Sequence, residues 1–362
     1  MVDLLADLVA VESPSADRDG TSRCADLVQD AGKQLLGEPA EMIVVDGTTH
    51  LRWCFGEQAG GVLLVGHLDT VWPVGTIERW PFSVSDGRAT GPGAFDMKGG
   101  IVQLLYGLTA LDSLDGVTVL ITADEEIGSP SSRQLIIDEV AGKQAALILE
   151  PAVGDDLKTA RKGVSMYDVE ITGRAAHAGL EPERGANATI ELAHQVLRIA
   201  GLGEPTAGTT VTPTVAAAGA TTNTVPAFAR LHVDVRAFSV EEQRRVDAEM
   251  KASSPSVDGV SVDIRGGPNR PPMPSSASVA LLARAQFVAA RLGLTPPGGI
   301  AVGGGSDGNF TAGAGVPTLD GLGAVGANAH AEGEYLEVSR MAERAALVAR
   351  LITDLLVERV SH

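Results

Sequence analysis

Three short, nearly all-apolar runs in this sequence each lead into residues that can bind a metal ion or move a proton. The runs are 61–66, 117–123 and 145–149, and the residues that follow them are His67 and Asp69, Glu125 and Glu126, and Glu150. Strands that are apolar at every position are buried on both faces of a sheet. Because the carboxyl ends of neighbouring strands in such a sheet face one crevice, we expect these side chains to meet there. A lone histidine or glutamate at a strand end is more often structural, but three such ends together favour a chemical site.

The spacing of these residues predicts separate roles. His67 and Asp69 are two apart on an extended segment, so both side chains point the same way. Asp69 is then placed to accept the second imidazole proton of His67, as residues behind metal-bound histidines do. Glu125 and Glu126 are adjacent, so their side chains diverge, and one can bind a metal ion while the other reaches the attacking water. Asp96 lies between glycines in GPGAFDMKGG, where its alternative role is that of a helix N-cap only.

The elements that must position these residues alternate between helical and strand-like patterns over the first 150 residues. Besides the three apolar strands, we expect helices over residues 3–11, 22–36, 99–111 and 131–140. Buried strands alternating with helices predict an α/β layer domain. The same pattern returns near the end of the chain, with expected helices over residues 279–292 and 338–356.

A different pattern interrupts this α/β domain. From about Gly163 the order becomes β-α-β-β-α-β, which is typical of a split ferredoxin-like α+β domain. We expect its strands over residues 164–171, 209–218, 229–236 and 260–264, and its helices over residues 186–200 and 240–252. A Pro/Gly-rich stretch, 266–276, is expected to be a linker. The predicted domains are therefore 1–162 with 268–362, and an inserted domain of 163–267.

The composition excludes several classes of function. A chain of 362 residues, 44% of them hydrophobic, is long enough for about two or three domains. Its net charge of −18 opposes binding to nucleic acid or to an anionic membrane, and no apolar run is long enough to span a bilayer. The first residues lack the basic start of a signal peptide, so we expect a cytoplasmic location. Cys24 and Cys54 are too few for a disulfide framework, and we expect both to be buried.

Nine short strings resemble the metallopeptidase family of aminoacylases and glutamate carboxypeptidases. They are GHLDTV (66–71), GPGAFDMKGG (91–100), ADEEIGSPSSR (123–133), LEP (149–151), GRAAHAGLEPERGANA (173–188), NTVP (223–226), DVR (234–236), GGGSDG (303–308) and NAHAEGEY (328–335). Each string alone is a weak signal, but nine in family order over nearly the whole chain are specific. The resemblance is greatest to the bacterial glutamate carboxypeptidases that cleave folates. It implies a di-metal hydrolase fold, aminopeptidase/phosphorylase-like, with an inserted lid and dimerisation domain.

The resemblance implies a set of metal ligands. The ligands would be His67 and Glu150 for one divalent ion, His330 and Glu126 for the other, and Asp96 as the bridge between them. Such a set leaves a position for a water molecule shared by the two ions, as a catalytic site requires. Imidazole and carboxylate ligands favour zinc, with cobalt or manganese as near equals. In this family the peptide bond after the bridging aspartate is often cis, so we expect Asp96–Met97 to be cis.

The resemblance also implies catalytic and substrate-binding roles. Glu125 would take a proton from the attacking water and deliver it to the leaving amine. His177, in the inserted domain, would stabilise the tetrahedral oxyanion, in some relatives from the partner subunit. Arg236, helped by Asn223, would hold the free carboxylate of the substrate, a task for which the guanidinium geometry is suited.

These roles favour a carboxypeptidase that acts on a small peptide or N-acyl amino acid with a free carboxylate. The preference for glutamate rests on the resemblance alone, since an arginine identifies only the carboxylate. An N-acyl-amino-acid amidohydrolase of the deacylase or desuccinylase type, or a dipeptidase, is the alternative. We expect a homodimer through the inserted domain, which a hinge would let close over the metal ions.

Two other classes of protein compete with this interpretation. GGGSDG formally fits the dinucleotide fingerprint G-x-G-x-x-G, but 43 glycines make chance matches common, and no acidic ribose partner completes the unit. A non-catalytic metal-binding scaffold is disfavoured because Glu125 and His177 accompany the full ligand set. The other histidines match no string and are expected to be structural or exposed; they are His50, His194, His232 and His362.

Overall fold

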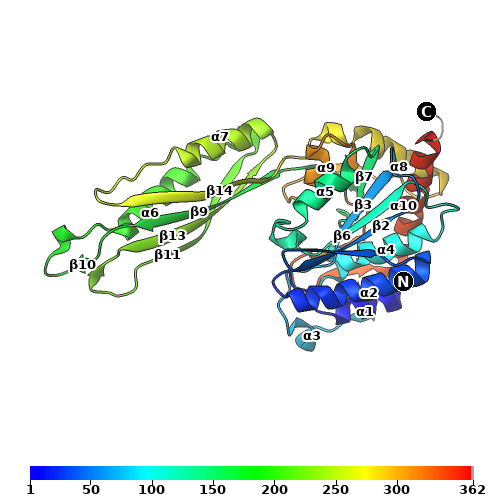
Figure 1. Cartoon of the computed structure of the whole chain (residues 1–362), viewed down its shortest axis with the longest axis horizontal. Helices are drawn as coiled ribbons and strands as arrows, with labels where there is room; N and C mark the ends of the chain where they lie inside the picture. The colour runs from blue at the N-terminus through cyan, green and yellow to red at the C-terminus, as the bar shows by residue number, and fades with distance from the viewer. Residues whose placement is uncertain (360–362) are drawn as a thin grey trace. The chain divides into compact units, whose positions relative to one another are not determined.

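The computed structural model describes residues 1–359, which divide into two compact units (Figure 1). Unit 1 combines Met1–Ala160, Met273–Val302 and the residues from Ser306 onward. Unit 2 consists of Arg161–Pro272 together with Gly303–Gly305. Within the described part of the chain, no helix has both the length and the apolar character needed to cross a membrane. His362 lies outside the described residues.

Unit 1 is built on a six-stranded sheet in the order β1-β2-β6-β3-β7-β16. Its strands are β1 (Glu41–Val45), β2 (Thr48–Cys54), β6 (Val117–Thr122), β3 (Val62–His67), β7 (Ala145–Ile148) and β16 (Thr318–Leu319). β6, β3, β7 and β16 run parallel to one another. β1 pairs antiparallel with β2, and β2 pairs antiparallel with β6. Every residue of β3, β6 and β7 is buried, as their apolar sequences predict.

Helices cover both faces of this sheet and explain its apolar strands (Figure 1). Leu63 and Val65 of β3 face a cluster with α5 and α9, whereas Val62 and Leu64 face the larger core with α2, α4 and α10. The alternation of side chains along a strand produces these two sets. The helices of unit 1 are α1 (Val2–Ala10), α2 (Arg18–Leu36), α3 (Thr76–Arg79), α4 (Gly99–Leu108), α5 (Arg133–Val140), α8 (Val279–Arg291), α9 (Gly308–Gly313) and α10 (Val338–Arg359).

Short strands outside the large sheet pair with one another and hold the connecting loops in place. A four-stranded sheet in the order β17-β18-β5-β4 joins residues far apart in sequence, and β8 pairs with β15 in a two-stranded ribbon. Their bounds are β4 (Ser83–Ser85), β5 (Arg88–Thr90), β8 (Leu157–Arg161), β15 (Gly299–Val302), β17 (Gly326–Ala327) and β18 (Tyr335–Glu337). The small sheet fixes the segment between β17 and β18, which contains His330.

Unit 2 has the expected β-α-β-β-α-β order. Its elements are β9 (Gly163–Thr172), α6 (Ala188–Ala200), β11 (Thr210–Ala218), β13 (Phe228–Ala237), α7 (Val240–Lys251) and β14 (Ser261–Arg270), with the short pair β10 (Ala176–His177) and β12 (Thr224–Val225). The antiparallel sheet has the order β11-β13-β9-β14. This is the ferredoxin-like arrangement, with the two helices packed on one face around Val169, Leu231 and Val246.

Two sequence expectations are wrong. The stretch from Gly266 to Arg270 is not part of a linker, because it continues β14 along β9. Glycines with positive φ at 266 and 267, and a bulge beyond Pro268, are tolerated because β14 is an edge strand. Cys24 is buried, but Cys54 is exposed, since it lies on the opposite face of β2 from the buried Trp53.

Candidate metal centre

The carboxyl ends of three parallel strands bring most of the candidate ligands of unit 1 together. His67 is the last residue of β3, and Glu150 follows two residues after the end of β7. Glu125 and Glu126 begin a short helical turn after β6. Parallel strands end at the same edge of a sheet, which is why residues distant in sequence meet here. Asp96 comes from the segment before α4, and its peptide bond to Met97 is cis, as expected.

The side chains form two pairs that share Asp96. Nε2 of His67 lies 3.4 Å from Oδ1 of Asp96 and 3.6 Å from Oε1 of Glu150. Nε2 of His330 lies 3.3 Å from Oδ2 of Asp96 and 3.2 Å from Oε2 of Glu126. Each imidazole thus faces one carboxylate of its own and one oxygen of the shared aspartate. This arrangement has the ligand types of a site for two divalent cations.

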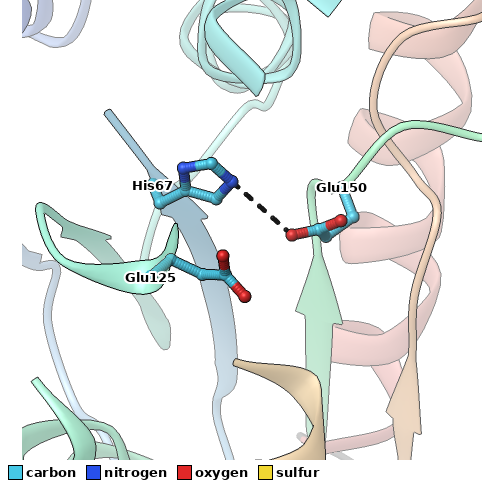
Figure 2. A group of neighbouring side chains, drawn as sticks. All are labelled: His67, Glu125 and Glu150. Carbon is cyan, nitrogen blue, oxygen red and sulfur yellow. Dashed lines mark ion pairs between the residues drawn. The ribbon is translucent and has the colours of Figure 1, made fainter. Parts of the chain in front are cut away.

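Two buried atoms at the centre indicate that a cation fits there. Nε2 of His67 and Oδ1 of Asp96 are buried, and neither forms a hydrogen bond with any described residue. A buried polar atom without a partner is costly, and a bound cation would satisfy both atoms. His67, Glu125 and Glu150 each offer a ligand atom within 4.8 Å of the others. Figure 2 shows the three side chains converging on one space, with the carboxylate of Glu125 turned into it.

Mutual charge shifts the pKa values of the ligands. Burial lowers the pKa of His67, but the neighbouring carboxylates of Asp69, Asp96 and Glu150 outweigh it and raise that pKa well above the ordinary value. Asp96 and Glu126 raise the pKa of His330 to about 10. A protonated imidazole therefore offsets part of the negative charge of the clustered carboxylates. A divalent cation would replace these protons, because a metal-binding histidine must be neutral.

Asp69 connects the strand end of β3 to the glutamates after β6. Its side chain is fully buried, and it accepts hydrogen bonds from the backbone N–H of Glu125 (3.2 Å) and of Glu126 (3.1 Å). Nδ1 of His67 is 3.0 Å from the backbone oxygen of Asp69 and 3.4 Å from its carboxylate. The nearest acceptor for the imidazole is therefore the carbonyl oxygen rather than the expected carboxylate. The carboxylate instead holds the base candidate and a ligand candidate in place.

Glu334 is a site residue that the sequence reasoning missed. It is fully buried, and its carboxylate accepts hydrogen bonds from the backbone N–H of Phe95 (2.8 Å) and Asp96 (2.9 Å) and from Nε1 of Trp72 (2.9 Å). Burial raises the pKa of Glu334 to about 7. Glu334 thus connects the backbone at Asp96 to the segment that carries His330. Its position in NAHAEGEY, four residues after that histidine, was the available signal.

Two further buried residues support the end of β6. Asp307, in GGGSDG, accepts hydrogen bonds from the hydroxyls of Thr122 (2.9 Å) and Ser129 (2.5 Å). His50 accepts the backbone N–H of Ala123 at Nδ1 (3.2 Å), and burial lowers its pKa. The expectation that His50 is structural is therefore confirmed, and the glycine-rich string supports the metal centre's own sheet.

Unit 2 brings His177 and Asn223 together. The backbone N–H of Ala178 donates to the carbonyl oxygen of Asn223 (2.9 Å), next to the pairing of β10 with β12. Nδ1 of His177 accepts hydrogen bonds from the N–H groups of Gly179 and Leu180, both at 3.1 Å. Because Nδ1 acts as an acceptor, the proton of the neutral ring is on Nε2. The exposed imidazole therefore presents an N–H donor.

Arg236 lies away from that pair. It is near the end of β13, opposite Val164, whereas β12 precedes the start of the same strand at Phe228. At about 3.3 Å per residue, the distance from Phe228 to Arg236 along the strand is roughly 26 Å. Unit 2 therefore does not bring Asn223 beside Arg236. The guanidinium forms two hydrogen bonds with Asp234 instead, each of 2.8 Å.

Comparison with known proteins identifies the family of this chain. A model of peptidase family M20/M25/M40 matches residues 63–354. Carboxypeptidase G2 of Pseudomonas sp. (strain RS-16) is 31% identical over an alignment of 378 positions, which covers 98% of this chain and 89% of that protein. Acetylornithine deacetylase of Pasteurella multocida (strain Pm70) is 35% identical over an alignment of 170 positions, which covers 44% of each chain.

A solved structure shares the fold over nearly the whole length. The M20 family metallo-carboxypeptidase Sso-CP2 of Sulfolobus solfataricus matches with a TM-score of 0.80 at 17% identity, covering 98% of both chains. The family model covers the segments that carry all five candidate ligands and Glu125. The chain therefore belongs to peptidase family M20/M25/M40 and is a metallopeptidase or amidohydrolase.

Proposed function

We propose that this chain uses two divalent metal ions to hydrolyse a peptide or amide bond and release a C-terminal amino acid. The observation that carries the proposal is the position of Asp96. Its two carboxylate oxygens lie 3.4 Å and 3.3 Å from Nε2 of His67 and His330 respectively. One carboxylate that faces two separate imidazoles suits a bridging ligand, and Glu150 and Glu126 complete the two ends.

The proposed ions are zinc, with cobalt or manganese as alternatives, because imidazole and carboxylate ligands suit all three. When bound, the two ions would lower the pKa of a shared water and polarise the carbonyl of the scissile bond. His67 and Glu150 would hold one ion, and His330 and Glu126 the other. The two buried atoms without hydrogen bonds, on His67 and Asp96, support this assignment.

Glu125 is the proposed general base. It accepts a proton from the attacking water and passes it to the nitrogen of the leaving amine, so the carboxylate returns to its starting state. Its carboxylate shares one space with His67 and Glu150 (Figure 2). The hydrogen bond from its own backbone N–H to Asp69 fixes the segment from which the side chain extends.

His177 and Arg236 are the proposed residues for transition state and substrate. The Nε2–H of His177 is a suitable donor to the oxyanion, since two backbone groups already occupy Nδ1. Asp234 binds Nε and Nη2 of Arg236, and Nη1 has no hydrogen-bond partner among the described residues. That leaves the Nη1/Nη2 edge of the guanidinium for the carboxylate of a substrate. Asn223, beside His177, would contact the substrate from the same segment.

We also propose a homodimer through unit 2. β11 is at the edge of its sheet and exposes Val215, and the neighbouring helix α6 exposes Ile190 and Leu197. An unpaired edge strand beside apolar side chains is a surface that a second copy can cover. The length of β13 from Phe228, next to β12, to Arg236 is roughly 26 Å and supports the same proposal. The carbonyl of the scissile bond and the C-terminal carboxylate of a substrate are only one residue apart, so they cannot contact both His177 and Arg236 of one chain.

The substrate that we propose is a small peptide or N-acyl amino acid with a free carboxylate. Glutamate is the first candidate because of the resemblance of the nine strings to glutamate carboxypeptidases, and release of a C-terminal residue also agrees with the 31% identity to carboxypeptidase G2 over 98% of this chain. Deacylation of an N-acyl amino acid is the second candidate, since acetylornithine deacetylase is 35% identical over 170 aligned positions. Dipeptide hydrolysis is the third candidate, and a non-catalytic metal-binding scaffold is the last. A cytoplasmic location is also proposed, and free Cys24 and Cys54 suit a reducing compartment.

A panel of substrates tests the proposal. Metal-analysed protein is incubated with peptidyl and N-acyl amino acids, including folyl and aminobenzoyl glutamates, and the released amino acid is measured. Chelation should abolish activity, and adding zinc, cobalt or manganese should restore it. Each substrate is paired with its C-terminal amide, which should react far more slowly. Activity that survives chelation, or that is equal on the amides, would refute the metal mechanism or the role of Arg236 respectively.

A further inference from the structure

The N-terminal segment contacts two parts of the candidate metal centre. One is the end of β3, which carries His67, and the other is the turn before α4, which carries Asp96. The side chain of Lys98 is buried, and Nζ donates hydrogen bonds to the carbonyl oxygens of Leu8 (2.9 Å) and Val11 (2.8 Å) at the end of α1. The hydroxyl of Ser13 donates to the carbonyl oxygen of Leu68 (2.7 Å). We call residues 8–15 the N-terminal brace.

Ser15, the last residue of the brace, contacts a side chain instead of the backbone. Its hydroxyl donates a hydrogen bond of 2.6 Å to Oδ2 of Asp69. The backbone that leads to Ser15 is fixed by a parallel bridge between Pro14 and Thr70 and by the hydrogen bond from the N–H of Thr70 to the carbonyl oxygen of Ser13. The hydroxyl of Ser15 is therefore held at a defined position relative to Asp69.

The carboxylate of Asp69 is fully buried and has few partners. It accepts hydrogen bonds from the hydroxyl of Ser15 and from the backbone N–H groups of Glu125 and Glu126, and its Oδ1 faces Nδ1 of His67 at 3.4 Å. Oδ2 accepts two of these hydrogen bonds, one from the hydroxyl of Ser15 and one from the backbone N–H of Glu126. A short O–H···O⁻ bond of this kind is among the stronger hydrogen bonds in proteins.

We propose that Ser15 is a positioning residue of the metal centre, acting through Asp69. The proposal rests on the proposed function in so far as Glu126 binds metal and Glu125 acts as the base. With the hydroxyl in place, the carboxylate of Asp69 is oriented so that each of its oxygens receives one backbone N–H of the turn after β6. Without the hydroxyl, the carboxylate turns to find another donor, and the turn that carries both glutamates moves with it.

The expected effect is on metal affinity. Replacing residues that orient metal ligands costs about 10- to 100-fold in affinity or activity in other metalloproteins. Ser15→Ala should weaken zinc binding to the metal-free protein by about that factor. Ser15→Thr keeps the hydroxyl and should restore binding to near the wild-type value. Ser15→Cys, with a weaker donor, should fall between them, and it replaces alanine in the comparison if the alanine variant does not fold.

Ser13→Ala is the matched control. It removes a hydroxyl from the same brace, two residues away, but that hydroxyl donates to a backbone carbonyl and not to Asp69. Zinc affinity is measured by competition with a chromophoric chelator, together with the melting temperature of each metal-free variant. If the brace were only structural, Ser13→Ala and Ser15→Ala would lower both quantities alike.

Three outcomes would overturn the proposal. They are wild-type affinity in Ser15→Ala, an equal loss of affinity in Ser13→Ala, and a loss in Ser15→Thr as large as in the alanine variant. Failure of the proposed function gives a different pattern, because the wild-type protein itself would then bind no zinc or hydrolyse none of the substrates. A selective loss of affinity in Ser15→Ala, restored by threonine, supports the proposal.

Discussion

Glu125→Gln separates two roles that the geometry allows for Glu125. Its carboxylate belongs to a group with His67 and Glu150 whose ligand atoms lie within 4.8 Å, so it is close enough to bind metal or to take a proton. Glutamine has the same shape but cannot accept the proton of the attacking water. General base catalysis contributes about 10²- to 10⁴-fold to a rate, which corresponds to about 3–5 kcal/mol of activation free energy. We therefore expect kcat to fall by about 10²- to 10⁴-fold while two ions remain bound.

The assay must measure metal content and rate on the same sample. Metal is quantified by mass spectrometry after dialysis, and kcat and KM are measured on the best substrate of the panel. Glu126→Gln is the control, because it changes the adjacent residue, which faces His330 at 3.2 Å. We expect this variant to lose affinity for one ion. If Glu125→Gln lost an ion and Glu126→Gln kept both, the two roles would be reversed. A kcat within about threefold of wild type would exclude Glu125 as the base.

Two further predictions concern the substrate and pH. Arg236→Gln should raise KM for substrates with a free carboxylate by about 10- to 100-fold, because hydrogen bonds to charged groups contribute about 1.5–3 kcal/mol each. Their C-terminal amides should be unaffected, and an equal effect on both kinds of substrate, in steady-state kinetics, would contradict the role. Metal affinity should rise with pH, because carboxylates raise the pKa of His67 and bring that of His330 to about 10, and each proton must leave before a metal ion binds. Chelator competition at several pH values below about 10 measures this slope, and pH-independent affinity would refute it.

The apolar strands made much of the site predictable. In β3, β6 and β7 every residue is buried, so their sequences revealed both the covered sheet and the edge at which ligands gather. His67 and Glu150 follow directly from that pattern. Asp96 and His330 lie in loops, where no periodicity marks them, and only the resemblance to a family of metallopeptidases identified them.

The supporting residues could not be predicted in the same way. Ser15 contacts Asp69 across 54 residues of sequence, and Glu334 contacts Asp96 across 238. Such pairs depend on how loops pack after the sheet has formed, and neither local propensity nor apolar spacing carries that information. The end of β14 was missed for a related reason. Its glycines and Pro268 read as a linker, but the register with β9 continues through them.

The register of unit 2 leads to a prediction about how many chains form one active site. His177 adjoins β12, before the start of β13, and Arg236 lies near the end of that strand. The intervening strand spans roughly 26 Å, which exceeds the length of an amino-acid-sized substrate. If both residues act on one substrate, they must come from different chains. In a homodimer, each active site would then use His177 of one chain and Arg236 of the other.

Mixing two variants that each have a low kcat/KM tests this division. In homodimers of His177→Ala or Arg236→Ala, every site lacks one of the two residues. In a mixed dimer, one site receives both wild-type residues and the other receives neither. After unfolding and refolding of equal amounts together, about half of the dimers are mixed, so about a quarter of all sites should be active. The measured kcat/KM per chain, taken at substrate concentrations near the wild-type KM or below, should therefore recover to about a quarter of the wild-type value. If both residues came from the same chain, every site in the mixture would still lack one of them, and activity would stay at the level of the separate variants.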